Sequence, residues 1–270
     1  ATDLFISEYV EGSSNNKYIE IFNGTGATVS LNDYKLRLFS NGASSPSSDI
    51  SLSGNISNNT TIVYRDAAAT IYGGSATSNA ACGFNGDDAV ALFKVSTNSY
   101  VDIFGSIGSD PGTAWTAGFP VTHTTLDKTL RRKSTVTGGI TTSPVSGFPT
   151  LESEWEVENT DFVSGLGSHT FSPPPIAIGT RTVASGASTI YIDEHLSLKF
   201  ISVTTGGTIQ VAFYGNPPTN ATGLTGNVSQ YRWVISNNGV AGFSVEFRVK
   251  RSSFLGLTSL TPGSLDVRLF

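Results

Sequence analysis

The sequence predicts an all-β protein built from two tandem β-sandwich domains, and three observations carry this prediction. Short apolar or alternating segments recur along the 270 residues, separated by Gly, Asn, Ser and Pro at the spacing of strands and turns. The polar residues are mainly Ser, Thr, Asn and Gly, which favour turns and extended strands over helices. The run Ser172-Pro-Pro-Pro175 interrupts the pattern and indicates a domain boundary.

The strand pattern of the first domain begins close to the N-terminus. Residues 4–9 and 18–22 form short apolar bursts, and residues 34–39 alternate large apolar side chains with basic ones, as in a half-buried strand. We expect one helical turn over residues 67–71. The remaining strands expected in this domain are residues 61–65, 89–94 and 100–104.

The second domain is expected to follow a stiff spacer. Three consecutive prolines cannot pair in a sheet ladder and favour an extended connection. We therefore expect domains at residues 1–171 and 176–270, joined by residues 172–175. The strands expected in the second domain are residues 176–183, 188–193, 196–203, 208–214, 230–236, 241–250 and 265–270.

Several motifs in the first domain point to a known family. The first strand contains the dipeptide Ser7-Glu8, the second carries Glu20 and ends in Asn23, and residues 31–36 read Leu-x-x-Tyr-x-Leu. These features resemble the lamin-tail domain, an immunoglobulin-like β-sandwich of nuclear lamins that is also widespread in secreted bacterial proteins. The resemblance implies a fold and an extracellular habitat, and it identifies no reaction.

Further blocks extend this resemblance to about residues 3–170. They are residues 85–94, residues 110–115, residues 129–133 and Trp155, which occur in the order expected for bacterial lamin-tail domains. The second domain is similar only loosely to immunoglobulin-like modules of large secreted proteins of the Bacteroidetes type, through residues 229–236.

Charge and length limit the partners. The chain carries 16 Lys and Arg against 21 Asp and Glu, a net charge of −5, whereas sequence-independent binding to nucleic acid needs clustered basic residues. No apolar run approaches the roughly 20 residues needed to cross a bilayer, so we expect no membrane span. The chain lacks Met and begins at Ala1, so we expect a mature secreted chain from which a signal peptide has been removed.

Candidate nucleophiles and bases have no supporting context. Cys82 is the only cysteine, which excludes an intrachain disulfide and favours a bacterial exterior. It has no basic neighbour in the sequence, so we expect a small buried apolar residue. We expect His123 in a loop, His169 in the closing strand of the first domain and His195 in a turn, without a catalytic motif around any of them.

The turn Asn85-Gly-Asp-Asp88 is the best candidate for a metal site, because calcium takes hard oxygen ligands from such loops. The alternative, which we favour, is that Asp87 caps the turn and Asp88 faces solvent. Asp102 and Asp110 could add oxygens only if the fold brings their loops to this turn.

Other polar clusters are expected to lie on the surface. Glu152, Glu154, Glu156 and Glu158 alternate, so in one strand they would share a face as a solvated acidic stripe. The basic run at residues 131–133 is expected at a strand edge or in a loop. Three tryptophans could stack on sugars but are expected in the core; these are Trp115, Trp155 and Trp233.

We therefore expect a non-enzymatic extracellular or cell-surface protein with a structural or adhesive function and no catalytic, cofactor-binding or metal-binding residues. Its partners would be other copies or cell-surface proteins, joined by edge-strand pairing, as in a filament or layer. The last strand runs to Phe270, and strands at both ends of the chain could be exchanged between copies. The alternative is an accessory or carbohydrate-binding module of a secreted nuclease- or phosphatase-type hydrolase, whose catalytic domain lies outside this chain.

Overall fold

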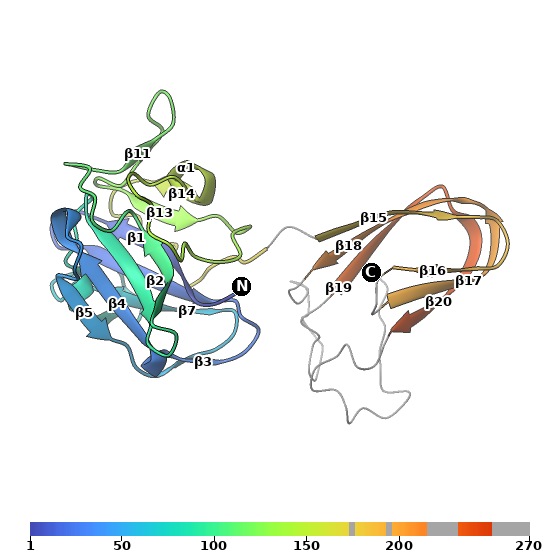
Figure 1. Cartoon of the computed structure of the whole chain (residues 1–270), viewed down its shortest axis with the longest axis horizontal. Helices are drawn as coiled ribbons and strands as arrows, with labels where there is room; N and C mark the ends of the chain where they lie inside the picture. Colours follow the sequence, from blue (N-terminus) through green and yellow to red (C-terminus); the bar gives the residue numbers. More distant parts are fainter. Residues whose placement is uncertain (173–175, 193–195, 215–231, 250–270) are drawn as a thin grey trace. The chain divides into compact units, whose positions relative to one another are not determined.

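A computed structural model describes residues 1–172, 176–192, 196–214 and 232–249 (Figure 1). The chain divides into two compact units, Ala1–Pro173 and Pro174–Phe270. Almost all regular structure in both units is β-strand, so the predicted all-β class is confirmed. Among the described residues, no helix has the length and the hydropathy that a bilayer crossing requires.

The first unit contains a six-stranded sheet with the order β14-β13-β1-β2-β7-β8. Its neighbours are antiparallel except for the short parallel pair β7–β8. The opening strand β1 lies inside the sheet, between β2 and β13, and is buried along its whole length. The strands are β1 (Phe5–Glu11), β2 (Lys17–Asn23), β7 (Thr60–Arg65), β8 (Thr77–Ser78), β13 (Thr129–Arg132) and β14 (Trp155–Glu158).

A four-stranded antiparallel sheet with the order β10-β9-β4-β5 forms the second layer. Its strands are β4 (Tyr34–Phe39), β5 (Ser48–Ser51), β9 (Ala89–Lys94) and β10 (Ser99–Phe104). Two small pairs accompany the sheets, namely β3 (Val29–Ser30) with β6 (Asn55–Ile56), and β11 (Thr116–Ala117) with β12 (His123–Thr124). The short helices are η1 (Leu31–Asp33), η2 (Ser40–Gly42), η3 (Ala80–Cys82) and α1 (Leu151–Glu154).

The core of the first unit is filled by alternate side chains of the two sheets and by aromatic rings at its centre. The ring of Tyr9 stacks against Phe84 at 4.5 Å and against Phe104 at 4.1 Å, and Trp155 meets Phe104 edge-on at 5.2 Å. Aromatic pairs of this kind add about 0.5–1.5 kcal/mol each to the burial of their apolar area. The two layers are therefore joined by a rigid aromatic centre.

The helical turn expected over residues 67–71 does not form. The carboxylate of Asp66 accepts a hydrogen bond from the backbone N–H of Ala68 at 2.8 Å, and the Asp66 carbonyl accepts one from Ala69 at 3.1 Å. This is the local turn that an Asp side chain offers in competition with a helix. Helical turns occur instead at the three η segments, which the sequence pattern did not indicate.

The second unit contains two three-stranded sheets, β15-β18-β19 and β16-β17-β20, among the described residues. They pack around Val183, Leu198, Phe200, Ile209 and Val211, all of which are buried. The strands are β15 (Ile176–Val183), β16 (Ser188–Tyr191), β17 (Leu196–Thr205), β18 (Gly207–Tyr214), β19 (Arg232–Asn238) and β20 (Ala241–Val249). The strand expected at residues 265–270 lies outside the described residues.

Candidate functional site

The turn at residues 85–88 is the first candidate site, and its two aspartates have the opposite roles to those expected. Asp88 is buried, at 1% exposure, and Asp87 is partly exposed. Asp88 Oδ2 accepts the backbone N–H of Asn85 at 2.8 Å, and its Oδ1 accepts that of Asn41 at 2.8 Å. Asp88 therefore caps the turn, and the expectation that Asp87 caps it while Asp88 faces solvent is wrong. Burial raises the pKa of Asp88 despite these two hydrogen bonds.

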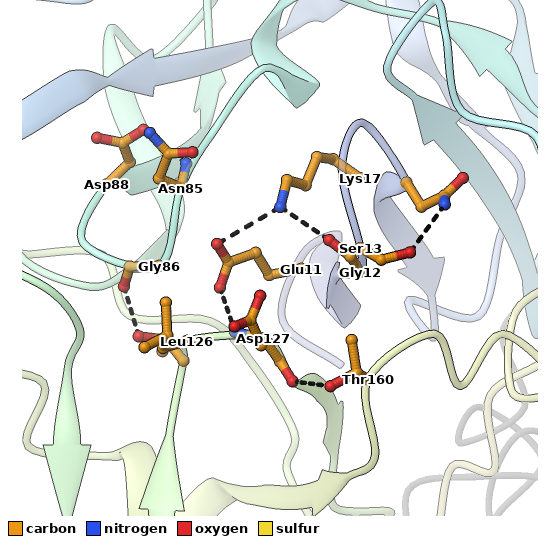
Figure 2. Close-up of polar contacts among 12 residues, drawn as sticks. Glu11, Gly12, Ser13, Lys17, Asn85, Gly86, Asp88, Leu126, Asp127 and Thr160 are labelled. Atoms are coloured by element: carbon orange, nitrogen blue, oxygen red, sulfur yellow. Dashed lines mark hydrogen bonds and ion pairs between the residues drawn. The ribbon is translucent and has the colours of Figure 1, made fainter.

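The adjacent strand ends place a second buried carboxylate beside this turn (Figure 2). Glu11 Oε1 lies 3.4 Å from Lys17 Nζ, and its Oε2 accepts the backbone N–H of Asp127 at 2.7 Å. Lys17 Nζ also donates to the carbonyl of Gly12 at 3.0 Å. A Cβ at Gly86 would lie 2.9 Å from Glu11 Oε2, so a side chain there would push against a fixed carboxylate. Burial raises the pKa of Glu11.

Two threonine hydroxyls complete this end of the first unit. Thr125 donates to the carbonyl of Gly86. Thr160 donates to the carbonyl of Asp127 (Figure 2). Both carboxylates are thus engaged by donors of the protein itself, and these bonds join several loops. Among the described residues, no group of three or more His, Cys, Asp or Glu side chains is placed to hold a metal ion. The arrangement is suited to holding loops together.

The two more distant aspartates behave differently from each other. Asp110 lies beside Gly42, next to Asn41, whose N–H is bonded to Asp88, so the fold does bring Asp110 towards the turn. Asp102 instead lies in β10, where it is fully buried and forms an ion pair with Arg132 at 3.1 Å. It also accepts the backbone N–H groups of Ile6 and Ile140, at 2.8 and 2.9 Å.

The basic run at residues 131–133 was expected at a strand edge or in a loop; Lys133 does follow β13 in a loop, but for Arg131 and Arg132, inside the sheet, that expectation is wrong. β13 lies between β14 and β1, and the side chain of Arg132 is fully buried. Besides Asp102, Arg132 faces Glu154 at 3.6 Å and lies over the ring of Trp155, with its Cζ 4.5 Å from the ring centroid. Because neighbouring residues of a strand point to opposite faces of the sheet, residues 131 and 132 could not both be surface charges. The prediction did not take this alternation into account.

The acidic stripe expected at residues 152–158 is also wrong. Glu152 and Glu154 lie in α1, whereas Glu156 and Glu158 lie in β14. The signal was present in the sequence, since Thr150 followed by acidic residues is typical of a helix start. Glu154 is drawn inward to Arg132, and burial raises its pKa.

A row of charges on the outer face of the six-stranded sheet is the most unusual site, and the sequence analysis did not predict it. Strand pairing places Glu156, Arg131, Glu8 and Glu20 side by side across four strands; we call this set the charged row. Glu20 accepts from the hydroxyl of Ser7 and from the backbone N–H of Gly167, both at 2.6 Å. The residues that carry the lamin-tail resemblance in β1 and β2 are thus bonded to each other.

Glu8 is the least satisfied member of the charged row. Its Oε2 lies 3.3 Å from Arg131 Nε, while its Oε1 is buried with no hydrogen-bond partner in the structure. Burial, followed by the charge of Glu20, raises the pKa of Glu8 to about 8, against the opposing effect of Arg131. A signal for this pair was available, since Glu8 and Glu20 interrupt two otherwise apolar strands.

Residues 163–171 cover Glu8 and Glu20 of the charged row; we call these residues the outer strap. Gly165 approaches so closely that a Cβ there would overlap Glu8 Oε2 and lie 2.7 Å from Arg131 Nε. A pair of carboxylates can perform acid–base chemistry on a glycoside only where substrate reaches both. Here the backbone at Gly165 and Gly167 occupies that position, so the pair is closed by the chain itself.

His169 belongs to this strap and not to a closing strand, so that expectation is wrong. Its ring lies 5.6 Å from the ring of Phe5 and 4.9 Å from that of Phe22, and its Nε2 is buried with no hydrogen-bond partner in the structure. Burial, together with the charges of Arg132 and Arg131, lowers the pKa of His169 to about 4.

The remaining candidate residues that the structure describes lie in the core or in the β11–β12 hairpin. Cys82 is fully buried in the core, where burial raises the pKa of its thiol. Trp115 and Trp155 also lie in the core, at 3% and 0% exposure. His123 lies in β12, with its Nδ1 2.8 Å from the hydroxyl of Thr122. His195 and the side chain of Trp233 lie outside what the structure describes.

Comparison with known proteins agrees with the fold. Residues 1–108 match the family model described as Lamin Tail Domain, which confirms the resemblance over this part of the chain. That family is immunoglobulin-like, in agreement with the predicted immunoglobulin-like sandwich class. The later motifs, which extend the resemblance to about residue 170, lie beyond the matched residues, although β13 and β14 belong to the same sheet. No curated protein and no solved structure matches the chain.

Proposed function

We propose that this protein is a non-enzymatic structural or adhesive protein of the cell exterior that acts by contact with other proteins, in the first place other copies of itself. The proposal rests on one observation: a hairpin whose base is fixed by hydrogen bonds carries exposed apolar side chains at its tip. The resemblance to a family widespread in secreted bacterial proteins supports the proposed location.

The hairpin is formed by β11 and β12 and extends away from the sandwich (Figure 1). Its base is held by Trp115, which is buried and exchanges hydrogen bonds with Thr125 at 3.0 and 3.1 Å. At its tip, Phe119 is fully exposed, at 103%, and Val121 is 62% exposed. Exposed aromatic and apolar residues that lie together are typical centres of protein–protein contacts.

Edge pairing supports the proposal less well than the hairpin does. β1 has strand neighbours on both sides, so exchange of the N-terminal strand between copies would require the sheet to open. The edge strand β14 carries Glu156 and Glu158, and charges on an edge oppose pairing with another strand. We therefore place the contact at the hairpin tip.

The test is the assembly state of the full chain, measured by light scattering and electron microscopy over a range of concentrations. We expect the unmodified chain to assemble and the double variant Phe119→Ser, Val121→Ser to stay monomeric with an unchanged circular dichroism spectrum. Val95→Ser is the matched control, since Val95 is 47% exposed at a different turn and should leave assembly intact. An unmodified chain that stays monomeric, or equal loss of assembly in the control, contradicts the proposal.

A second measurement separates the non-enzymatic function from its rival. The full chain is incubated with phosphodiesters, phosphomonoesters and a panel of polysaccharides, and both turnover and retention are recorded. We expect neither. Turnover at any rate that scales with the protein concentration would refute the non-enzymatic assignment, and retention on a polysaccharide would favour the carbohydrate-binding alternative.

A further inference from the structure

We propose that the outer strap is a detachable latch. It lies docked on the six-stranded sheet while Glu8 carries a proton, and it separates from the sheet, with the sandwich intact, when Glu8 ionises beside Glu20.

The strap is held by apolar contacts at both ends and by polar contacts in the middle. Near its start, Val163 and Leu166 pack against Val10, Tyr18 and Val63 of the sheet. Near its end, His169 and Phe171 lie against the rings of Phe5 and Phe22.

Between these contacts lies the charged row, with Gly165 over Glu8 and the N–H of Gly167 bonded to Glu20. The middle of the strap is therefore the part whose stability depends on charge.

Two ionised carboxylates at this place would be poorly compensated. Glu20 has donors from Ser7, Gly167 and Thr61, which favour its ionised form. Glu8 lies directly opposite it on the neighbouring strand and has only Arg131, at 3.3 Å, while its second oxygen is buried without a donor. Like charges opposite each other on adjacent strands repel. Departure of the strap would let water reach the unpaired oxygen.

The groups that face Glu8 come from every neighbouring element. β2 contributes Glu20, β13 contributes Arg131 and β14 contributes Glu158. The loop after β7 brings Tyr72 near, and the strap itself brings His169 towards Arg131. Only Arg131 among these favours an ionised Glu8.

The dependence on pH follows from the proton count of the two forms. Docked Glu8 has a pKa of about 8 and an ordinary carboxyl 4.5, so between these values the docked form holds one proton more. Rising pH therefore favours release about tenfold per unit, until the effect levels off above pH 8. The raised pKa of Glu20 acts in the same direction.

His169 acts in the opposite direction. Docked, its pKa is about 4, against an ordinary 6.5, so between these values the released form holds one proton more and falling pH favours release. The two effects offset each other between about pH 4.5 and 6.5, where docking is firmest. A net rise in release remains between about pH 6.5 and 8.

Release changes the protein beyond the strap. Release would expose the ring faces of Phe5 and Phe22 on the sheet, while Ser172 stays anchored through its N–H to the carbonyl of Ser134 at 2.7 Å. The latch thus controls whether this face of the sheet is covered.

The experiment reports opening through a thiol placed in the strap of the full chain. Leu166→Cys puts a thiol at a position that is only 7% exposed when docked, and Ser168→Cys puts one at an exposed position of the same strap. The native Cys82 is buried and stays silent. The labelling rate at position 166 divided by that at 168, at each pH, removes the reactivity of the thiol itself.

We expect this ratio to rise about tenfold per unit between pH 6.5 and 8 and to level off above that range, while the near-ultraviolet circular dichroism of the buried tryptophans stays constant. Adding Glu8→Gln should make the ratio flat over this range and low. Glu156→Gln, at the exposed end of the charged row, is the matched control and should keep the full rise. Glu20→Gln removes the neighbouring charge and should shift the levelling to lower pH.

A ratio that does not change with pH in the unmodified strap overturns the proposal, and so does an equal rise in the Glu8→Gln variant. If Glu8→Gln fails to fold, the shift in Glu20→Gln decides: no shift refutes coupling between the two carboxylates. Loss of the tryptophan signal together with labelling would mean global unfolding and would also refute a latch.

Discussion

Asp102 and Arg132 form a fully buried ion pair of 3.1 Å that joins the two sheets of the first unit. Asp102 comes from β10 and Arg132 from β13, and Asp102 also accepts the backbone N–H of Ile6 in β1 at 2.8 Å. The N–H of Ile6 lies outside the part of β1 that pairs with β13, next to the irregularity in the β1–β2 pairing. The carboxylate of Asp102, which comes from the second sheet, thus takes the place of a backbone acceptor in the first sheet.

Removal of the cation should be costly because it leaves Asp102 charged and buried. We expect Arg132→Met to lower the free energy of unfolding of the first unit by about 3–5 kcal/mol. The exposed pair of Lys35 and Asp49, at 3.0 Å, is the matched comparison, and Lys35→Met should cost about 1 kcal/mol or less. Urea unfolding followed by tryptophan fluorescence measures both, and similar costs for the two variants would contradict the buried role of the pair.

Asp88 and Asp87 should respond very differently to the same change. Asp88→Ala deprives the N–H groups of Asn41 and Asn85 of their acceptor, so we expect a loss of about 1–3 kcal/mol in unfolding free energy. Asp87→Ala should stay within about 0.5 kcal/mol. The melting temperature is then measured with millimolar calcium and with a chelator. A rise in the melting temperature with calcium that disappears in either variant would show that this turn binds calcium.

The thiol of Cys82 should be inert in the folded protein. It is fully buried, and burial raises its pKa, so little thiolate forms at pH 8. We expect no reaction with a thiol-specific dye in native buffer and one equivalent in guanidinium chloride. Rapid labelling of the native chain would show that the core opens readily at η3.

The matched family segment should not fold by itself. Residues 1–108 lack β13, which in the full unit pairs with β1 and supplies Arg132 to Asp102. We expect a fragment of residues 1–108 to remain unfolded or aggregate, because the buried strand β1 gains an open edge. A fragment of residues 1–172 should unfold cooperatively. Proton NMR dispersion distinguishes these outcomes, and a well-dispersed spectrum from the short fragment would contradict them.

Strands were the most predictable part of this protein. Period-2 alternation and turn residues placed β4, β9 and β18 within one residue of their observed ends, because these signals are local. The lamin-tail resemblance placed Ser7, Glu8 and Glu20 on neighbouring strands, although their mutual bonding was not foreseen.

Side-chain roles that depend on distant partners could not be predicted. Arg132 was interpreted as a surface charge because the sequence does not show that Asp102, thirty residues earlier in the chain, lies beneath it. Glu8 became a buried acid only because Gly165 covers it. His169 was assigned to a strand although its segment is fixed by contacts with Phe5 and Phe22. In each case the deciding contact is long-range, whereas propensity reports only on neighbours.

The internal position of β1 has a consequence for how the chain acquires its structure during synthesis. Val10 pairs with Thr129, so the ribosome must add roughly 120 residues after the first strand before that strand gains its second neighbour. Sheets completed by such distant partners fold slowly, because a long loop must close before the new pairing is rewarded. Until then β1 has an unpaired edge in the nascent β1–β2 hairpin, and its apolar side chains are exposed. This hairpin is therefore the part of the nascent chain that most needs a chaperone.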